Sequence, residues 1–449
     1  MLVSNPAMLV TAREFAPRLT SARCALAAWS FVLLSMELMV GGPFGVQVHG
    51  VSIRFLIWAV AIVCSIRWLL ADALGARLAR RWVLLSAALF LGWGLVVPAF
   101  RGGSVANGIL EARPLLTSPV VFSAYCGLRH FGTRKFVSIL AVVSAIPALA
   151  VVIAWSAQVL LADEVPAQLL KWWLSSGSAE LPGVYIGPMP DGSYRVMWIA
   201  VMFFPFTLLC RSFSRDYALW VVVTGLGAAC SGTRAVIGAW FIVIFVVGFC
   251  RRGVASGTLL SGAVAACLIS LSGGSGFRVL TFADLADDDD PRVVQTTALL
   301  GEFFKSPLLG CGFGGGPELV RSDVAQFSYE MTYVALLAKL GLFGCFLVGI
   351  WLLATLQWTL LLGRAARWVT FAALLCFVII TATNPYLLNL FGIWLSSVLI
   401  ALLGWNCETS VRFVGKQVRG CERLGVFPLG RRMGSTAHPV SSGLSGGAR

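Results

Sequence analysis

Arg234 is the residue that most directly predicts chemistry, because it interrupts the otherwise uncharged run from Tyr217 to Cys250. A charge at the centre of a membrane costs several kcal/mol, about 2.5–3.5 on insertion scales, and about 20 residues suffice to cross a bilayer. A turn at Gly232 resolves both problems, since it divides the run into two spans and leaves Arg234 at a membrane surface. Guanidinium groups bind phosphates in a bidentate manner. This position therefore predicts contact with a lipid-linked phosphate or pyrophosphate.

Further arginines on the same predicted side of the membrane extend this hypothesis. Each lies near a membrane boundary or in a large loop, where the positive-inside rule predicts few basic residues. We expect them to bind the substrate together with Arg234, while the simpler alternative is that they contact lipid headgroups. These candidate substrate-binding residues are Arg195, Arg278, Arg292 and Arg321.

Glu330 is the candidate catalytic base, because it stands where the second large loop re-enters the membrane. A carboxylate next to the arginines could accept a proton from a substrate hydroxyl; the alternative is a carboxylate that stabilises the N-terminus of the following helix. Tyr333 follows one turn later on the same helix face and is a further candidate for substrate binding. Glu37 is an intramembrane carboxylate whose role the sequence leaves open.

Other motifs predict little chemistry. The segment Gly310–Gly316 superficially resembles a nucleotide-binding loop, but it follows no predicted strand and opens no βαβ unit, so we interpret it as a flexible turn. The run Asp287–Asp290 could hold a divalent cation, although such a run is more often a solvated loop. His49, His130 and His438 stand far apart and predict no metal or triad site. The 12 cysteines lie mostly inside apolar runs without a C-x-x-C motif, so we expect neither disulfides nor a metal.

The composition places these residues in a membrane protein. Of the 449 residues, 58% are hydrophobic and 12% are charged, against about 25% charged in a soluble domain. We therefore expect an all-α, polytopic integral membrane protein that forms a single domain. The net charge of +14 does not predict nucleic-acid binding, because much of it flanks the ends of apolar runs, where it fixes topology.

The apolar runs predict about twelve transmembrane helices. Basic clusters occupy every second connection, and both termini share their side, which the positive-inside rule identifies as the cytoplasm. We expect a cytoplasmic N-terminus at 1–23, a transmembrane domain at 24–410 and a basic, partly disordered cytoplasmic tail at 411–449. The runs fall at about 24–44, 53–70, 82–99, 114–128, 136–161, 196–210, 217–231, 235–250, 254–272, 331–362, 368–383 and 388–405.

Two long connections fall on the outward side, at about 162–195 and about 273–330. The second is the only segment outside the membrane that is large enough to build a site. Within it, apolar residues recur at helical spacing from Arg292 to Phe304, which predicts an amphipathic helix on the outer membrane surface, ended by Pro307. The long run at 331–362 predicts a helix inside or at the rim of the membrane before the span itself.

In their order along the chain, several of these motifs resemble those of the bacterial O-antigen polymerase and O-antigen ligase family of membrane glycosyltransferases. The resemblance covers about residues 195–405, and the succession of motifs is more specific than any single one. The N-terminal half is similar only in its pattern of spans. The motifs are Ser231-Gly232-Thr233-Arg234-Ala235, Pro291-Arg292, the segment Glu302–Gly314, Glu330-x-x-Tyr333-x-x-Leu336-Leu337-x-x-x-Gly341-Leu342-x-Gly344 and Thr383-Asn384-Pro385-Tyr386.

The resemblance implies a glycosyltransferase of the bacterial inner membrane that uses undecaprenyl-pyrophosphate-linked glycans at the periplasmic face, without a nucleotide sugar, cofactor or catalytic metal. A flippase and a chain-length regulator are the implied protein partners. Ligases of the family usually carry a histidine where this chain has Glu330, which favours a polymerase of oligosaccharide repeat units. The alternatives are a ligase that transfers glycan to lipid A-core or protein and, from another class, a transporter. Transporters are commonly two similar halves joined by a central cytoplasmic connection, which this chain does not resemble.

Overall fold

The computed structural model describes most of the chain, and helices form nearly all of the described part. The described residues are 22–40, 47–48, 51–71, 73–175, 185–188, 194–197, 199–211, 216–252, 291–317, 329, 331–360, 362, 364–382 and 389–423. The helices before the first long loop are α1 (Ala22–Val40), α2 (Ile53–Ser65), η3 (Ile66–Leu69), α3 (Leu74–Leu89), the π-helix η4 (Phe90–Val96), α4 (Val97–Phe100), α5 (Val105–Ala112), η5 (Arg113–Thr117) and α6 (Val120–Leu161). The later helices are α7 (Val165–Ser175), η6 (Ile199–Phe203), α8 (Phe204–Arg211), α9 (Tyr217–Ser231), α10 (Arg234–Arg252), α13 (Pro291–Lys305), α14 (Thr332–Thr359), α15 (Arg364–Ala382) and α16 (Leu390–Arg423).

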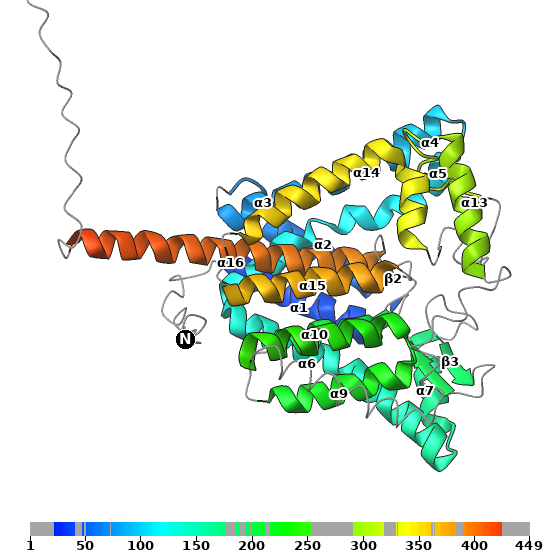
Figure 1. Cartoon of the computed structure of the whole chain (residues 1–449), viewed down its shortest axis with the longest axis horizontal. Helices are drawn as coiled ribbons and strands as arrows, with labels where there is room; N and C mark the ends of the chain where they lie inside the picture. The colour runs from blue at the N-terminus through cyan, green and yellow to red at the C-terminus, as the bar shows by residue number, and fades with distance from the viewer. Residues whose placement is uncertain are drawn as a thin grey trace, which may run out of the picture.

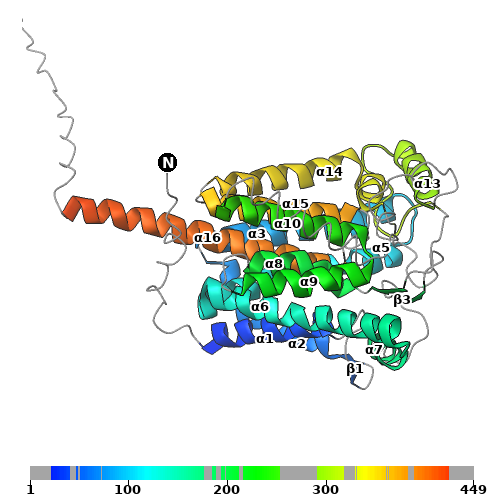
Figure 2. The same ribbon diagram turned by 60° about the horizontal axis from the view of Figure 1, so that its bottom comes forward.

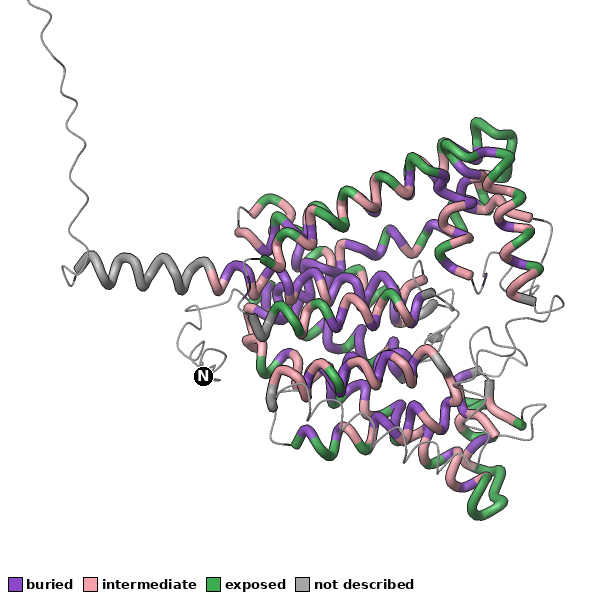
Figure 3. The backbone as a smooth tube through the Cα atoms, viewed as in Figure 1, coloured by how far each residue is buried: buried purple, intermediate pink, exposed green. Residues whose placement is uncertain are grey.

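The long helices lie side by side in one bundle (Figures 1 and 2). α6 is central to it and packs against α1, α2, α8, α9 and α16. Large apolar and aromatic side chains such as Phe31, Phe136 and Trp240 fill the interior. Figure 3 shows buried residues concentrated where helices face one another and exposed residues along the outer faces.

Many exposed residues of the bundle are large and apolar. Val63 is 70% exposed, Leu84 is 62% exposed and Leu353 is 64% exposed. Water-soluble proteins rarely expose large apolar patches, whereas a hydrocarbon solvent favours them. The outer surface of the bundle therefore fits a lipid environment.

Five helical segments among the described residues are long and apolar enough to cross a membrane, which supports the prediction of a helical membrane protein. Four shorter apolar helices accompany them, and the predicted run 254–272 lies outside the described residues. The count of twelve spans stays a prediction. The five segments are Ala22–Met39, Leu74–Phe100, Val105–Leu161, Thr332–Thr359 and Leu390–Ser410.

Two glycines break long helices. Gly132 (φ 74°, ψ 159°) interrupts α6, in the basic connection predicted between the runs 114–128 and 136–161. Gly341 (φ 61°, ψ −173°) interrupts α14, so the long run at 331–362 consists of a short first helix followed by a longer one. Both conformations are accessible to glycine and strained for other residues.

The mostly helical fold agrees with the expected all-α class, and two short antiparallel hairpins occur in addition. One pairs β1 (Gln47–Val48) with β2 (Val51–Ser52), and the other pairs β3 (Tyr185–Pro188) with β4 (Tyr194–Met197). The second hairpin is attached to the bundle: the Trp155 indole N–H donates to the Tyr194 carbonyl at 3.0 Å, and Val196 is fully buried. The sequence carries a signal for it, since a Pro-Asp-Gly turn motif at 190–192 stands between the two strands.

The described elements of the two predicted outward loops lie at one end of the molecule. α7, the β3–β4 hairpin and α13 are at this end, and the last part of α16 projects from the other (Figures 1 and 2). The predicted topology places these elements on one side of the membrane; which side that is, and how many spans the chain has, stay predictions. α13 itself confirms the predicted helix, but its apolar side packs on α14 rather than facing only a membrane. That contact contains Leu299, Phe303, Tyr329, Val334, Ala335 and Ala338.

Candidate functional site

The chain turns at Gly232, as the isolated charge in this apolar run predicts. α9 ends at Ser231, Gly232 is left-handed (φ 61°, ψ 15°) and α10 begins at Arg234. The Gly232 N–H donates to the Ala229 carbonyl at 2.9 Å and closes the helix, as glycine commonly does at this position. The side chain of Arg234 is outside the described part, so its contacts stay a prediction.

Arg195 lies directly against this turn. It stands on β4, which packs on both α6 and α9. A Cβ atom built on Gly232 would lie 2.7 Å from Arg195 Cδ and 2.8 Å from its Nε, so the arginine side chain crosses the bare face of the glycine. The strand register places Gly187 opposite Arg195, which leaves this side chain without a bulky cross-strand neighbour. The structure thus brings a predicted substrate-binding arginine next to the turn that carries Arg234.

The other predicted arginines are only partly placed by the structure. Arg292 stands in the first turn of α13 and is half-buried. The helix α13 lies at the same end of the molecule as the β3–β4 hairpin (Figure 1). Arg278 and Arg321 lie outside the described residues. The same holds for the candidate base, Glu330, although both of its sequence neighbours are described.

Tyr333 is directed toward α15. Its hydroxyl donates to the Val378 carbonyl at 3.0 Å and lies 2.8 Å from Thr381 Oγ1. The side chain is 39% exposed. Its hydroxyl therefore already has protein partners, and a role in substrate binding would use its exposed ring or an exchange of these hydrogen bonds.

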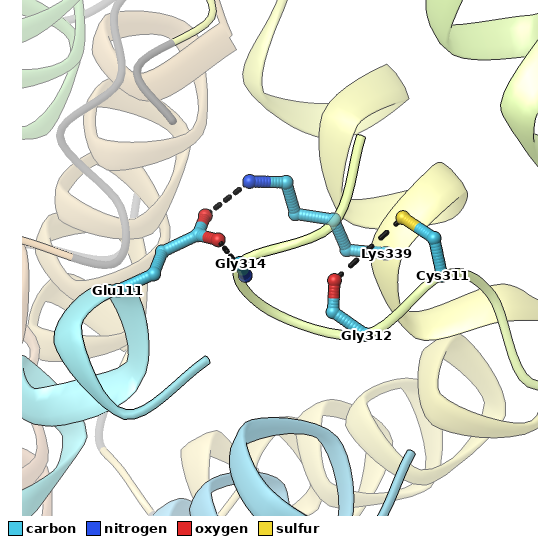
Figure 4. A network of polar contacts seen from close by, with 5 residues as sticks. All are labelled: Glu111, Cys311, Gly312, Gly314 and Lys339. Atoms are coloured by element: carbon cyan, nitrogen blue, oxygen red, sulfur yellow. Dashed lines mark hydrogen bonds and ion pairs between the residues drawn. The ribbon is translucent and has the colours of Figure 1, made fainter. Parts of the chain in front are cut away.

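A polar cluster that sequence reasoning missed lies at the N-terminal part of α14 (Figure 4). The Lys339 ammonium forms an ion pair with the Glu111 carboxylate of α5, and the side chains are only 2% and 13% exposed. The second oxygen of the carboxylate accepts the Gly314 N–H at 2.6 Å. Lys339 stands in an otherwise apolar segment, a pattern that by itself marks an ion in need of a partner. Glu111 lies in the connection between the predicted runs 82–99 and 114–128, where a carboxylate attracts no notice.

The segment Gly310–Gly316 is a firmly bonded loop rather than the expected flexible turn. The N–H groups of Cys311 and Gly312 donate to carbonyls of α14 at 2.9 and 3.0 Å, and that of Phe313 donates to the Trp93 carbonyl at 2.8 Å. Phe313 is fully buried. Left-handed backbone conformations at Gly310, Gly312 and Gly314 (φ 70°, 79° and 75°) permit this path, which explains the repeated glycines.

Trp93 connects the π-helix η4 to the same loop. Its indole N–H is shared between the carbonyls of Leu309 and Leu340, each at 2.9 Å. Leu309 immediately precedes the glycine loop, and Leu340 immediately precedes the break in α14 at Gly341, so the indole N–H bonds to both segments where they meet. A buried carbonyl without a donor is costly, so this single side chain stabilises two backbone groups that the break exposes.

Burial sets the protonation of two groups next to this loop. It raises the pKa of the Tyr329 hydroxyl to about 12, with the Glu111 carboxylate acting in the same direction. It also raises the pKa of the Cys311 thiol to about 11, although Lys339 acts in the opposite direction. Both groups are neutral near pH 7, so Cys311 is not an activated thiolate nucleophile.

Glu37, whose role the sequence leaves open, has a partner. Its carboxylate forms an ion pair with Arg54 at the start of α2, and the side chains are 7% and 6% exposed. The Arg54 guanidinium also lies 5.9 Å from the centroid of the Phe391 ring on α16. This pair neutralises two buried charges and joins three helices, which accounts for an acidic residue in the first span.

No group of three His, Cys, Asp or Glu side chains that could hold a metal ion occurs in the part of the chain that the structure describes. The run Asp287–Asp290 is outside that part. Comparison with protein-family models, with curated proteins and with solved structures finds no match for this chain. The fold and contacts therefore define a mostly helical membrane protein with a built polar cluster at one end; its activity is a matter of proposal.

Proposed function

We propose that the protein is a membrane glycosyltransferase that polymerises undecaprenyl-pyrophosphate-linked oligosaccharide repeat units at the periplasmic face of the bacterial inner membrane. In this proposal the chain has about twelve spans, and both termini lie in the cytoplasm. The contact of Arg195 with Gly232 carries the proposal, because it assembles two arginine positions from separate elements at the end of the molecule that holds both predicted outward loops. The resemblance of the motif order to the O-antigen polymerase and ligase family supports the same conclusion.

The proposed reaction uses these groups as follows. The hydroxyl of the incoming repeat unit attacks the anomeric carbon of the growing glycan, and the bond from that carbon to the pyrophosphate oxygen breaks. The lipid pyrophosphate leaves with the electron pair, and Arg195 and Arg234 stabilise its developing charge. Glu330 accepts the proton of the attacking hydroxyl. The lipid pyrophosphate is itself the activated leaving group, so the step needs no nucleotide sugar.

Arginine suits this task better than lysine would. Its planar guanidinium binds two phosphate oxygens at once and stays charged at any relevant pH. Charge stabilisation is also stronger near a membrane surface than in bulk water, because the effective dielectric constant is lower. The left-handed Gly232 lets the Arg195 side chain approach the turn closely, beside the point in the chain where α10 begins at Arg234.

The test is complementation of a strain that lacks its native copy of this protein. We expect the wild-type chain to restore long surface glycans and Arg234→Ala, Arg195→Ala and Glu330→Gln to fail although present in normal amounts. Lys171→Ala, which removes an exposed cation of α7 at the same end of the molecule, is the control and should restore chain length. Long glycans at normal level in the Arg234 and Glu330 variants would refute this assignment of roles.

The same strain separates polymerase from ligase. A polymerase defect leaves lipopolysaccharide that carries single repeat units, because the ligation step still works. A ligase defect leaves unsubstituted core and accumulated lipid-linked polymer. Unsubstituted core in the deletion strain would replace the polymerase proposal with the ligase alternative.

A further inference from the structure

The ion pair of Glu111 and Lys339 has no part in the proposed phosphate site, yet Lys339 is among the least exposed charged side chains in the described part of the chain. Lys339 is 2% exposed, and a buried ion pair is seldom retained for stability alone, because desolvation offsets most of its attraction. A buried ion pair can instead be retained because it specifies one arrangement of the segments that it joins. The segments joined here therefore indicate what the pair does.

The pair joins three segments that are distant in sequence. Glu111 belongs to α5, and its carboxylate binds both the Lys339 ammonium on α14 and the Gly314 N–H of the glycine loop (Figure 4). The loop in turn is bonded to α14, since the N–H groups of Cys311 and Gly312 donate to the carbonyls of residues 338 and 339. Without the carboxylate, the hydrogen bonds between α14 and the loop would remain, but the ion pair that joins α5 to Lys339 would be lost.

Lys339 also contacts Tyr329, the residue before Glu330. Its ammonium lies 5.1 Å from the centroid of the Tyr329 ring, within the range of a cation–π interaction. Tyr329 is 4% exposed, and a Cβ atom on Gly316 would lie 2.7 Å from its hydroxyl oxygen. The Tyr329 ring is thus held between the ammonium and the end of the glycine loop.

We propose that Glu111 and Lys339 are positioning residues for the proposed transfer reaction. The pair fixes Tyr329 and the short first helix of α14, before the break at Gly341, against the glycine loop, and so sets where the chain enters the membrane at the end of the molecule that carries the site. The carboxylate orients the ammonium, the ammonium holds the tyrosine ring, and the ring fixes the backbone one residue before the candidate base. We call the contacts among Glu111, Lys339, Tyr329 and the glycine loop the clamp. The kinetic consequence of the clamp rests on the proposed function, whereas the clamp itself rests on the contacts above.

Two variants separate positioning from mere folding. Glu111→Gln keeps an oxygen that can accept the Gly314 N–H but takes the counter-charge from Lys339, so we expect a lower unfolding temperature and a lower kcat. Glu111→Gln/Lys339→Met removes both charges at similar volume. We expect it to regain most of the unfolding temperature, because no buried ammonium lacks a counter-charge, but not kcat, because Tyr329 has lost the ammonium.

The assay uses the full-length protein in vesicles with lipid-linked repeat units as substrate. We expect kcat of the double variant to fall about 10- to 100-fold, the scale of a misplaced reacting group, while KM stays within about 2-fold because the phosphate site is intact. Glu302→Gln/Lys305→Met removes the same charges from a more exposed pair on α13, whose side chains are 19% and 70% exposed, and should leave kcat and KM unchanged. A double variant with wild-type kcat would overturn the proposal.

Hydrogen exchange distinguishes a failure of this inference from a failure of the proposed function. The peptide 306–317 contains the bonded N–H groups of the loop, and we expect its exchange to speed up in Glu111→Gln. If exchange is faster in Glu111→Gln but the wild-type protein itself polymerises nothing, the proposed function is refuted and the clamp stands. Unchanged exchange in this variant would refute the clamp, whatever the activity.

Discussion

Replacing Gly341 by alanine tests the break in α14 and the packing of the glycine loop together. The residue has φ 61° and ψ −173°, a region that is essentially limited to glycine. The methyl group would lie 2.4 Å from the Gly310 backbone nitrogen and 2.5 Å from the Leu308 carbonyl oxygen. Neither atom belongs to a flexible side chain, so the loop would have to leave α14.

The magnitude follows from two contributions. An alanine in this conformation costs about 1–3 kcal/mol, and forcing a methyl group into a packed site costs about 1–3 kcal/mol more. The sum, about 2–6 kcal/mol, is a large part of the 5–15 kcal/mol that typically stabilises a folded protein. The loop also loses the bonds from the Leu342 and Phe343 N–H groups to the carbonyls of 307 and 308, at 2.8 and 3.0 Å.

The matched control is Gly349→Ala in the second part of the same helix. No heavy atom lies within 4 Å of a Cβ built there, and alanine is favoured over glycine in a helix by about 1 kcal/mol. In thermal unfolding of the detergent-solubilised protein, we expect Gly341→Ala to unfold far below the wild type and Gly349→Ala at or above it. Equal unfolding temperatures for the two variants would show that α14 is unbroken at Gly341 in the native protein.

Three further predictions follow from individual contacts. Gly232→Ala strains a left-handed position by about 1–2 kcal/mol and displaces Arg195, so glycan synthesis should fall. The control Gly238→Ala, with open space around its Cβ, should retain glycan synthesis. Equal activity of the two variants would contradict the contact between Arg195 and Gly232. Trp93→Phe removes the donor shared by two carbonyls and should lower the free energy of unfolding, measured by chemical denaturation, by about 1–3 kcal/mol. A decrease below roughly 0.5 kcal/mol, the scale of a neutral surface change, would refute this role of Trp93. The raised pKa of Tyr329, about 12, adds stability that is complete below pH 10 and is lost as pH rises through 12. The free energy of unfolding of Tyr329→Phe should therefore fall less steeply than that of the wild type between pH 10 and pH 12. Identical dependence of stability on pH in the two proteins would contradict the burial of this hydroxyl.

The turn at Gly232 and the helix α13 could be predicted from the sequence because each follows from local physics. A lone charge in a run too long for one span forces a turn, and apolar residues at helical spacing predict a helix. The β3–β4 hairpin has one local signal, the Pro-Asp-Gly motif at 190–192, but strands of four residues are too short to show a clear alternation of apolar and polar residues.

The pairing of Glu111 with Lys339 could not be predicted in the same way. Lys339 stands out as an ion in an apolar segment, but which partner it meets depends on how α5, the glycine loop and α14 pack in three dimensions. The same holds for Glu37, whose partner Arg54 lies on the next helix, and for Arg195, whose contact with Gly232 depends on where β4 packs. Sequence patterns identify groups that need partners, whereas the fold decides the partners.

The most direct test of the central claim is product formation by the purified protein in vesicles that contain only lipid-linked repeat units. We predict a ladder of lipid-linked glycans that lengthens with time, with one lipid pyrophosphate released for each bond formed, and no ladder from Arg234→Ala. No ladder from correctly folded wild-type protein, or an unchanged ladder from the Arg234 variant, would contradict it.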